Sequence, residues 1–211
     1  MKKLSVLLLV MVMSIHVMGK ENDLIPLPEP QKTGGMPLME ALNHRQSSRS
    51  FQEKEIPNQL LSNLLWAAFG VNREGGKRTA PSSQGKNEIE IYISTAKGLF
   101  LYVPEENALK KIHDKDIRKQ TGKQNFVAKA PMNLIYVANY KKAGKNIDPE
   151  IYRYTSGINT GFIAQNVYLY CASEGLGTVV RGWFDEKELR EAMGLEDYKG
   201  IILTQTVGYK K

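Results

Sequence analysis

The chain has 211 residues, 42% of them hydrophobic, with 29 basic and 22 acidic residues, a formal net charge of +7 and a single cysteine. This composition excludes a disulfide-stapled scaffold, a disordered polar chain and a large multidomain enzyme. The length suits one domain that buries a substantial core.

The first nineteen residues have the pattern of a signal peptide. Lys2 and Lys3 precede an apolar run from Leu7 to Met13, and Val17-Met-Gly19 offers the small residues that a signal peptidase accepts. The run is shorter than the roughly 20 residues that a bilayer span needs. We expect cleavage after Gly19, no stable membrane insertion, and a mature protein in the bacterial periplasm or secreted. An uncleaved anchor or a buried N-terminal helix is the alternative.

Removal of this segment would take away two lysines and leave a net charge of +5. The remaining sequence has no Cys/His framework, RNP aromatic signature or Arg-rich arm, so we expect no nucleic-acid partner. Its two histidines, His44 and His113, lack the closely spaced Cys or His partners of a zinc site, so no metal is expected. Cys171 lies in an apolar helical stretch, which favours a buried thiol over a nucleophile.

Residues 20–35 hold three prolines and two adjacent glycines, which predicts an extended lead-in without helix. The domain itself is expected over residues 36–211. Its first half starts with a short helix from Pro37 into the polar run HRQSSRS, followed by a helix over Asn58–Phe69. A long loop over residues 71–87 exceeds the usual connection length and predicts a functional role.

The second half is expected to contain more strands than helices. In chain order the predicted elements are a hairpin over Glu88–Ser94 and Leu99–Val103, a charged surface helix over Ala108–Arg118, a buried strand over Met132–Ala138, a long helix over Pro149–Glu174, a strand over Thr178–Phe184, a helix over Glu186–Met193 and a strand over Ile201–Val207. The long helix is apolar on more than one face, which indicates the centre of a domain or an interface. Helices and strands do not alternate strictly. The prediction is therefore α+β, with a mixed or antiparallel sheet of about five strands flanked by helices.

A polar cluster follows the first predicted helix. The run HRQSSRSF places guanidinium groups at Arg45 and Arg49, with serine hydroxyls between and after them. Arginines four residues apart share one side of a helical turn and suit a phosphate dianion or a polyol chain. On composition alone, a solvated basic helix end is the alternative.

Further motifs accompany this cluster in chain order. They are the loop Arg78-Thr-Ala-Pro-Ser-Ser83, Ala130-Pro131 before a hydrophobic strand, Gly175-Leu-Gly177 after the long helix, Gly182 after the next strand, and Val207-Gly-Tyr209 in the last strand. Together with Arg45-Gln-Ser-Ser-Arg-Ser-Phe51, they resemble the FMN-dependent nitroreductase family over essentially the whole mature chain. The stretch LLWAAFGVNREGGKRTAPSS is most similar to the azoline-oxidising, SagB-type peptide dehydrogenase branch.

The resemblance implies a homodimer with the long helix at its interface and two FMN molecules bound between the subunits. The cofactor-binding residues that it implies are Arg45, Gln46, Ser47 and Arg49 for the phosphate, ribityl chain and pyrimidine edge; Pro81, Ser82 and Ser83 from the other subunit for the outer ring; the backbone N–H groups of Arg181 and Gly182 near flavin N5 and O4; and Gln124 or Asn125 for the pyrimidine carbonyls. Many relatives also place a Lys or Arg pair on the phosphate. Here Lys210 or Lys211 would serve, unless the phosphate has one cation fewer and these lysines are a solvated tail.

A flavin would account for the lack of a recognisable catalytic triad or metal cluster. The cofactor carries hydride at N5, an arginine stabilises negative charge at its N1–C2=O edge, and no protein acid or base is required. The leading hypothesis is an FMN-dependent oxidoreductase that passes hydride by a ping-pong cycle between NAD(P)H and a small flat or unsaturated substrate. The alternatives are an exported flavin- or ligand-binding protein with little turnover, and an azoline-type peptide dehydrogenase. Export would remove the protein from the usual NAD(P)H pool, so the donor stays open.

Overall fold

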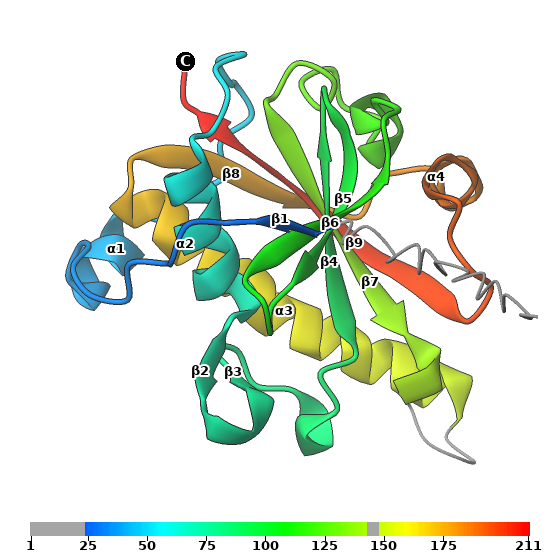
Figure 1. Ribbon diagram of the computed structural model, residues 1–211. Coiled ribbons are helices and arrows are strands. Elements are labelled where there is room, and N and C mark those ends of the chain that lie inside the picture. Colours follow the sequence, from blue (N-terminus) through cyan, green and yellow to red (C-terminus); the bar gives the residue numbers. More distant parts are fainter. Residues whose placement is uncertain (1–23, 143–147) are drawn as a thin grey trace, which may run out of the picture.

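The computed structural model describes residues 24–142 and 148–211. A seven-stranded antiparallel sheet runs through it in the order β1-β6-β5-β4-β7-β9-β8 (Figure 1). Its strands are β1 (Leu24–Pro26), β4 (Ile89–Thr95), β5 (Gly98–Val103), β6 (Ala108–His113), β7 (Met132–Asn139), β8 (Leu176–Arg181) and β9 (Lys199–Tyr209). A separate ribbon is formed by β2 (Val71–Arg73) and β3 (Lys77–Arg78), within the predicted long loop.

Helices cover both faces of the sheet. They are α1 (Leu38–His44), α2 (Asn58–Phe69), α3 (Pro149–Ser173) and α4 (Glu186–Met193). Helices α2 and α3 lie on one side of the sheet and α4 on the other (Figure 1). Side chains of α2 and α3 share one hydrophobic core with the sheet, and side chains of α4 share a second core with its other face. This arrangement confirms the predicted α+β class.

Strand β7 shows why both faces need a cover. Leu134 and Tyr136 lie in the core under α2 and α3, whereas Ile135 and Val137 lie in the core under α4. All four side chains are fully buried. Because successive side chains of a strand point to opposite faces, an unbroken apolar run of this kind fits a strand that is covered on both sides. The prediction of a buried strand here is confirmed.

Local sequence signals mark the start of α3 and both ends of α4. The Asp148 side chain accepts a hydrogen bond from the N–H of Glu150 at the start of α3, whose first residue is Pro149. Asp185 plays the same part at the start of α4, and Gly194 in the left-handed region ends that helix. Both starts satisfy backbone donors that have no partner within the helix.

The predicted surface helix over Ala108–Arg118 is wrong. Its first six residues form strand β6, and Arg118–Thr121 form a 3-10 turn. Asn107, with φ 44°, closes the tight turn after β5, and β6 then pairs with both β5 and β1. Backbone hydrogen bonds to two neighbouring strands outweigh the helix propensity of the lysines in this segment. With β1, this strand brings the sheet to seven strands instead of the expected five.

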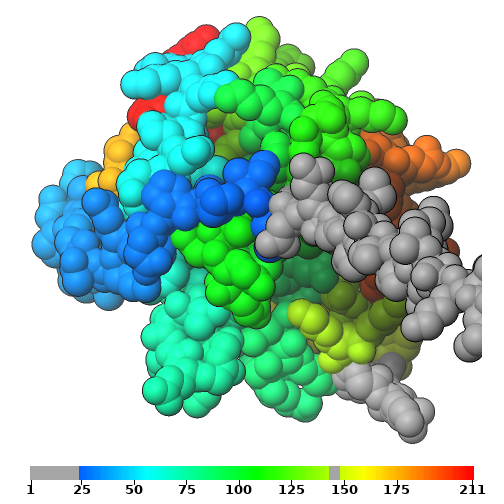
Figure 2. All heavy atoms as spheres, viewed as in Figure 1, coloured from blue at the N-terminus to red at the C-terminus, as the bar shows by residue number. Residues whose placement is uncertain are grey.

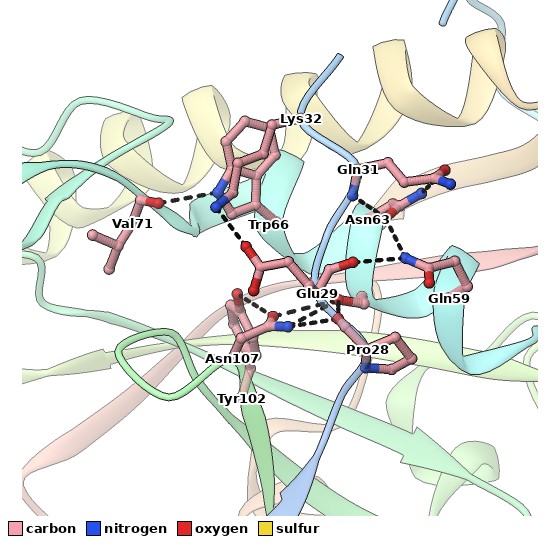
Figure 3. A network of polar contacts seen from close by, with 11 residues as sticks. Pro28, Glu29, Gln31, Lys32, Gln59, Asn63, Trp66, Val71, Tyr102 and Asn107 are labelled. Carbon is pink, nitrogen blue, oxygen red and sulfur yellow. Dashed lines mark hydrogen bonds and ion pairs between the residues drawn. The ribbon is translucent and has the colours of Figure 1, made fainter. Parts of the chain in front are cut away.

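Residues 24–36 contain β1 and no helix. Figure 2 shows the segment, in blue, crossing the surface of the molecule. Side chains from elsewhere fasten its backbone (Figure 3): Gln59 Nε2 donates to the carbonyl of Glu29 at 2.9 Å. Asn107 Nδ2 donates to the carbonyl of Pro28 at 2.8 Å. This lead-in therefore packs as part of the domain; the expected signal over residues 1–19 lies outside the described residues.

Helix α3 is apolar on more than one face, as predicted. Ile163 and Val167 are fully buried beneath the sheet, whereas Ile151, Ile158 and Phe162 are exposed. Within the two described ranges, no helix is long and apolar enough to cross a membrane. The exposed apolar side of α3 is instead suited to contact with another protein surface.

Candidate functional site

The polar cluster after α1 is extended, not helical. Helix α1 ends at His44, and Arg45 has φ −61° and ψ 121°. The N–H of Ser48 donates to the carbonyl of Thr178 at 2.9 Å, so this segment pairs with the backbone of β8. The expectation that Arg45 and Arg49 share one side of a helical turn is therefore wrong, because serine-rich backbone finds partners on a neighbouring strand more readily than it continues a helix.

A hydroxyl chain connects this segment with α3 and β8. Ser47 Oγ lies 2.9 Å from the hydroxyl oxygen of Tyr168, and the N–H of Val180 donates to the same oxygen at 3.0 Å. The guanidinium carbon of Arg45 lies 5.4 Å from the centre of the Tyr168 ring. Among the described residues, neither Arg45 nor Arg49 forms an ion pair with a carboxylate. These cations are therefore available for an anionic ligand.

The C-terminal residues lie against the same segment. Phe51 forms an isolated bridge with Lys210, and Gln52 Nε2 donates to the carbonyl of Lys210 at 2.6 Å. A Cβ atom placed on Gly177 would lie 2.9 Å from Ser48 Cβ and 3.1 Å from Lys210 Cγ. Only glycine allows this close approach. The structure thus brings Lys210 beside the arginine segment at the start of β8.

The other end of β8 carries a buried cation. Arg181 is 5% exposed; its guanidinium donates to the carbonyl of Thr121 at 2.9 Å and to Asn133 Oδ1 at 2.8 Å. No ion pair joins it to a described carboxylate, and burial lowers the pKa of Arg181 to about 10. The side chain therefore stays charged at neutral pH. Sequence reasoning assigned only its backbone N–H; the alternation with Val179, which shares its face of β8, was the signal that the side chain points inward.

Gln124 and Asn125 lie at this end as well. The N–H of Lys123 donates to the carbonyl of Trp183 at 3.1 Å, so the loop that contains Gln124 and Asn125 lies beside Gly182. Gly182 and Asn125 are exposed. Gln124 Oε1 is buried and has no hydrogen-bond partner in the described structure. A buried acceptor without a partner costs free energy unless a ligand donor reaches it.

Pro81, Ser82 and Ser83 lie apart from both ends of β8, beside the middle of α3. The N–H and hydroxyl of Ser83 both lie 3.3 Å from Asn159 Oδ1 on α3. The arginine segment contacts α3 at Tyr168 instead, about 13 Å farther along the helix axis. One subunit therefore presents two separate groups of predicted site residues, as expected if the loop serves a second subunit.

These groups fit a molecule with an anionic end and a polar ring. Unpaired cations and Lys210 lie at the start of β8, and the unpartnered Gln124 Oε1 could accept from the N3–H of a flavin pyrimidine at its other end. The six-residue strand between them spans about 16 Å. The residues present therefore fit the phosphate and the ring of the FMN that the sequence resemblance implies.

Other chemistry has less support. Cys171 is buried, and burial raises the pKa of its thiol well above its ordinary value, so a reactive thiolate is not formed near neutral pH. In the part of the chain that the structure describes, no group of three or more His, Cys, Asp or Glu side chains could hold a metal ion.

The chain is similar to known proteins over most of its length. The model of the nitroreductase family matches residues 42–209. A Methanocaldococcus jannaschii protein, provisionally named a nitroreductase, is 33% identical over 196 residues, which cover 88% of this chain and 96% of that protein. A crystal structure from Ralstonia eutropha with the same provisional name is 44% identical, covers 92% of each chain and has a TM-score of 0.85.

A more distant structure shares the fold alone. It is a chain of the Escherichia coli microcin synthetase McbBCD complex with truncated pro-MccB17 bound. The similarity covers 97% of this chain and 85% of that chain, with a TM-score of 0.70 at 19% identity.

Proposed function

Because the chain belongs to the nitroreductase family of oxidoreductases, we propose that it binds FMN and passes hydride between a donor and a small flat or unsaturated substrate. The observation that carries this proposal is the pair of polar ends on β8. Arginines that form no ion pair with any described carboxylate lie beside its first half, and Gln124 Oε1, a buried acceptor without a partner in the described structure, lies beside its last residue. Bound FMN would supply hydride transfer at its N5 atom.

The chain's own residues would bind and orient that cofactor. Arg45 and Arg49, with Lys210, provide donors for phosphate and ribityl oxygens, and Ser47 is held in place by its contact with Tyr168. The buried charge of Arg181 creates positive potential at the other end of the strand, where it would favour an electron-rich ring. These residues need not transfer a proton themselves.

The proposal extends to the electron donor and to the location of the protein. A Staphylococcus epidermidis structure with the same fold, 18% identical and with a TM-score of 0.63, is provisionally named an NAD(P)H:FMN oxidoreductase. By analogy we propose NAD(P)H as the donor. The signal pattern of residues 1–19 supports export to the periplasm or beyond, where NAD(P)H would have to be supplied from outside its usual cytosolic pool.

We expect the purified chain to show the visible absorption of an oxidised flavin, directly or after reconstitution with FMN. Anaerobic dithionite should bleach this absorption, and NADPH should do so if it is the donor. A chain that takes up no flavin even after reconstitution would refute the proposal. Bleaching by dithionite alone indicates another donor, and a flavin that is reduced but never reoxidised by nitroaromatic or unsaturated acceptors indicates a binding protein with little turnover.

We also propose a homodimer that buries the exposed side of α3. Replacement of Ile158, which is 42% exposed there, by aspartate should weaken self-association at least about 100-fold, because an unpaired charge would be buried in an apolar contact. FMN should be lost in parallel, since both subunits contribute to its site. Light scattering coupled to size-exclusion chromatography measures the mass.

Ile112 on β6 is the matched control, with 37% exposure at the opposite part of the sheet. Ile112→Asp should leave the mass unchanged. A dimer that survives Ile158→Asp but is lost with Ile112→Asp would place the interface at β6 and would contradict an interface on α3.

A further inference from the structure

The loop that carries Pro81–Ser83 ends in a constrained turn. Gln84 has φ 56° and Asn87 has φ 48°, on either side of Gly85. Residues with a Cβ adopt this left-handed region only where the surrounding structure holds them there. The turn therefore depends on contacts that outweigh its backbone strain.

A buried carboxylate makes the first of these contacts. Glu88 is 1% exposed, and its Oε2 accepts a hydrogen bond from the Ser82 hydroxyl at 2.9 Å. The N–H of Asn87 donates to that same hydroxyl oxygen at 2.9 Å. The Ser82 hydroxyl thus links the two ends of the turn, Asn87 and Glu88 on one side and Ser82 on the other. Its hydrogen bond to the Glu88 carboxylate is stronger than one to a neutral acceptor.

The second contact joins the turn to the long helix. Asn159 is 2% exposed in the middle of α3, and its Nδ2 donates to Glu88 Oε1 at 2.8 Å. Its Oδ1 faces the N–H and hydroxyl of Ser83, each at 3.3 Å. One amide therefore connects the base of the loop with the loop residue that the cofactor proposal uses, and Figure 1 shows the loop after β3 lying beside α3.

A cavity of 110 Å³ adjoins these groups, and other titratable side chains lie close to Glu88 and Asn159 around it. Tyr152 of α3 and Lys86 of the loop line it, and Lys142 Nζ donates to the carbonyl of Asn87 at 2.8 Å. Burial, followed by the charge of Glu88, raises the pKa of the Tyr152 phenol, so this group stays neutral near pH 7. The cavity leaves room for the turn to move if its hydrogen bonds are lost.

We propose that Glu88 and Asn159 are positioning residues that hold Pro81–Ser83 in place from the interface helix α3. We call this pair the Glu88–Asn159 latch. The inference rests on the proposed function, in which Pro81–Ser83 covers the flavin of the partner subunit. Asn159 lies on α3, the helix that the proposal places at the dimer interface. The order of the loop, the dimer contact and FMN binding then all depend on this one buried amide–carboxylate pair.

Replacement of Asn159 by aspartate tests the latch. At about pH 8 two carboxylates would face each other at the distance of a hydrogen bond, and their repulsion should open the turn; at about pH 5.5 the pair should share one proton and close it again. We expect cleavage of the loop by proteinase K to accelerate about tenfold at the higher pH, and the FMN dissociation constant to rise about tenfold, a change of about 1.4 kcal/mol. Both values should return to within about twofold of wild type at the lower pH, each compared with wild type at the same pH.

Asn166→Asp is the matched control, because it adds the same charge to α3 two turns away, where the Asn166 amide donates to the carbonyl of Ala68. This variant should show no pH-dependent difference from wild type. Cleavage of Asn159→Asp at the wild-type rate at both pH values would overturn the latch. Faster cleavage with unchanged FMN affinity and dimer mass would overturn its coupling to the site. A wild-type chain that binds no FMN would instead refute the proposed function, while cleavage and dimer mass would still decide whether the latch exists.

Discussion

Replacement of Arg45 by alanine is expected to weaken FMN binding about 10- to 150-fold, because a hydrogen bond to a charged group contributes about 1.5–3 kcal/mol. The Arg45 guanidinium lies over the ring of Tyr168 and has no carboxylate partner among the described residues, so no internal ion pair competes for it. Quenching of FMN fluorescence during titration of the apoprotein measures the dissociation constant.

Two variants make this test specific. Arg45→Lys keeps the charge but loses the fork of donors, so it should lie between wild type and alanine. Lys110→Ala removes one exposed cation from β6, which lies toward the opposite edge of the sheet, and should leave FMN affinity unchanged. Equal affinity of wild type and Arg45→Ala would show that the phosphate or ribityl assignment is wrong.

Replacement of Lys199 by methionine should lower the free energy of unfolding by about 3–5 kcal/mol, because it removes a buried cation that pairs with the half-buried Glu90 and the exposed Glu196 and leaves both carboxylates without it. Lys199 is 7% exposed; its Nζ lies 3.0 Å from Glu90 Oε2 and donates to the hydroxyl of Tyr92 at 2.9 Å. Methionine keeps most of the side-chain stem and removes the cation. Urea denaturation followed by circular dichroism measures the change.

The exposed ion pair between Lys97 and Glu55 provides the control. Its atoms lie 2.8 Å apart, but both side chains are 71% exposed, and Lys97→Met should cost less than about 1 kcal/mol. The double variant Lys199→Met with Glu90→Gln should recover part of the loss, because the unpaired carboxylate is removed as well. A loss at Lys199 no larger than that at Lys97 would contradict the assignment of a buried pair.

The effect of Lys199→Met should not vary between about pH 6 and about pH 9. Burial alone would lower the pKa of Lys199, but its hydrogen bonds to Tyr92 and Glu90 raise it above the ordinary value. A raised lysine pKa means that the stabilisation is fully present below the unfolded-state pKa and is lost only as pH rises through the higher folded-state pKa. Burial likewise raises the pKa of Tyr92 to about 12, so its titration lies above this range too.

Several elements could be predicted from short stretches of sequence. The bounds of α2 and α4 match their predicted ranges, Asn58–Phe69 and Glu186–Met193, because Pro57 and Asp185 start these helices and glycines follow them. The apolar run of β7 indicated a buried strand, and the structure shows it covered on both faces. The motifs between Arg45 and Tyr209 indicated the nitroreductase family, which the family comparison confirms.

The errors concern segments whose partners lie far away in the chain. The lysine-rich stretch from Ala108 became a strand because β5 and β1 offer it backbone hydrogen bonds on both sides. The segment after His44 is extended instead of helical because the N–H of Ser48 donates to the carbonyl of Thr178. Neither outcome follows from local propensity, since both partners join the segment only when the sheet assembles.

Local sequence alone established the charge of the chain, the helices with capping signals, the buried strand β7 and the family. Periodicity and capping act within about one or two turns, so they survive without knowledge of the fold. The folded chain was needed to show that Arg181 buries its charge and that Asn159 contacts Glu88, 71 residues away. Such contacts depend on desolvation and on hydrogen bonds between distant segments, which exist only once the sheet and α3 have packed together.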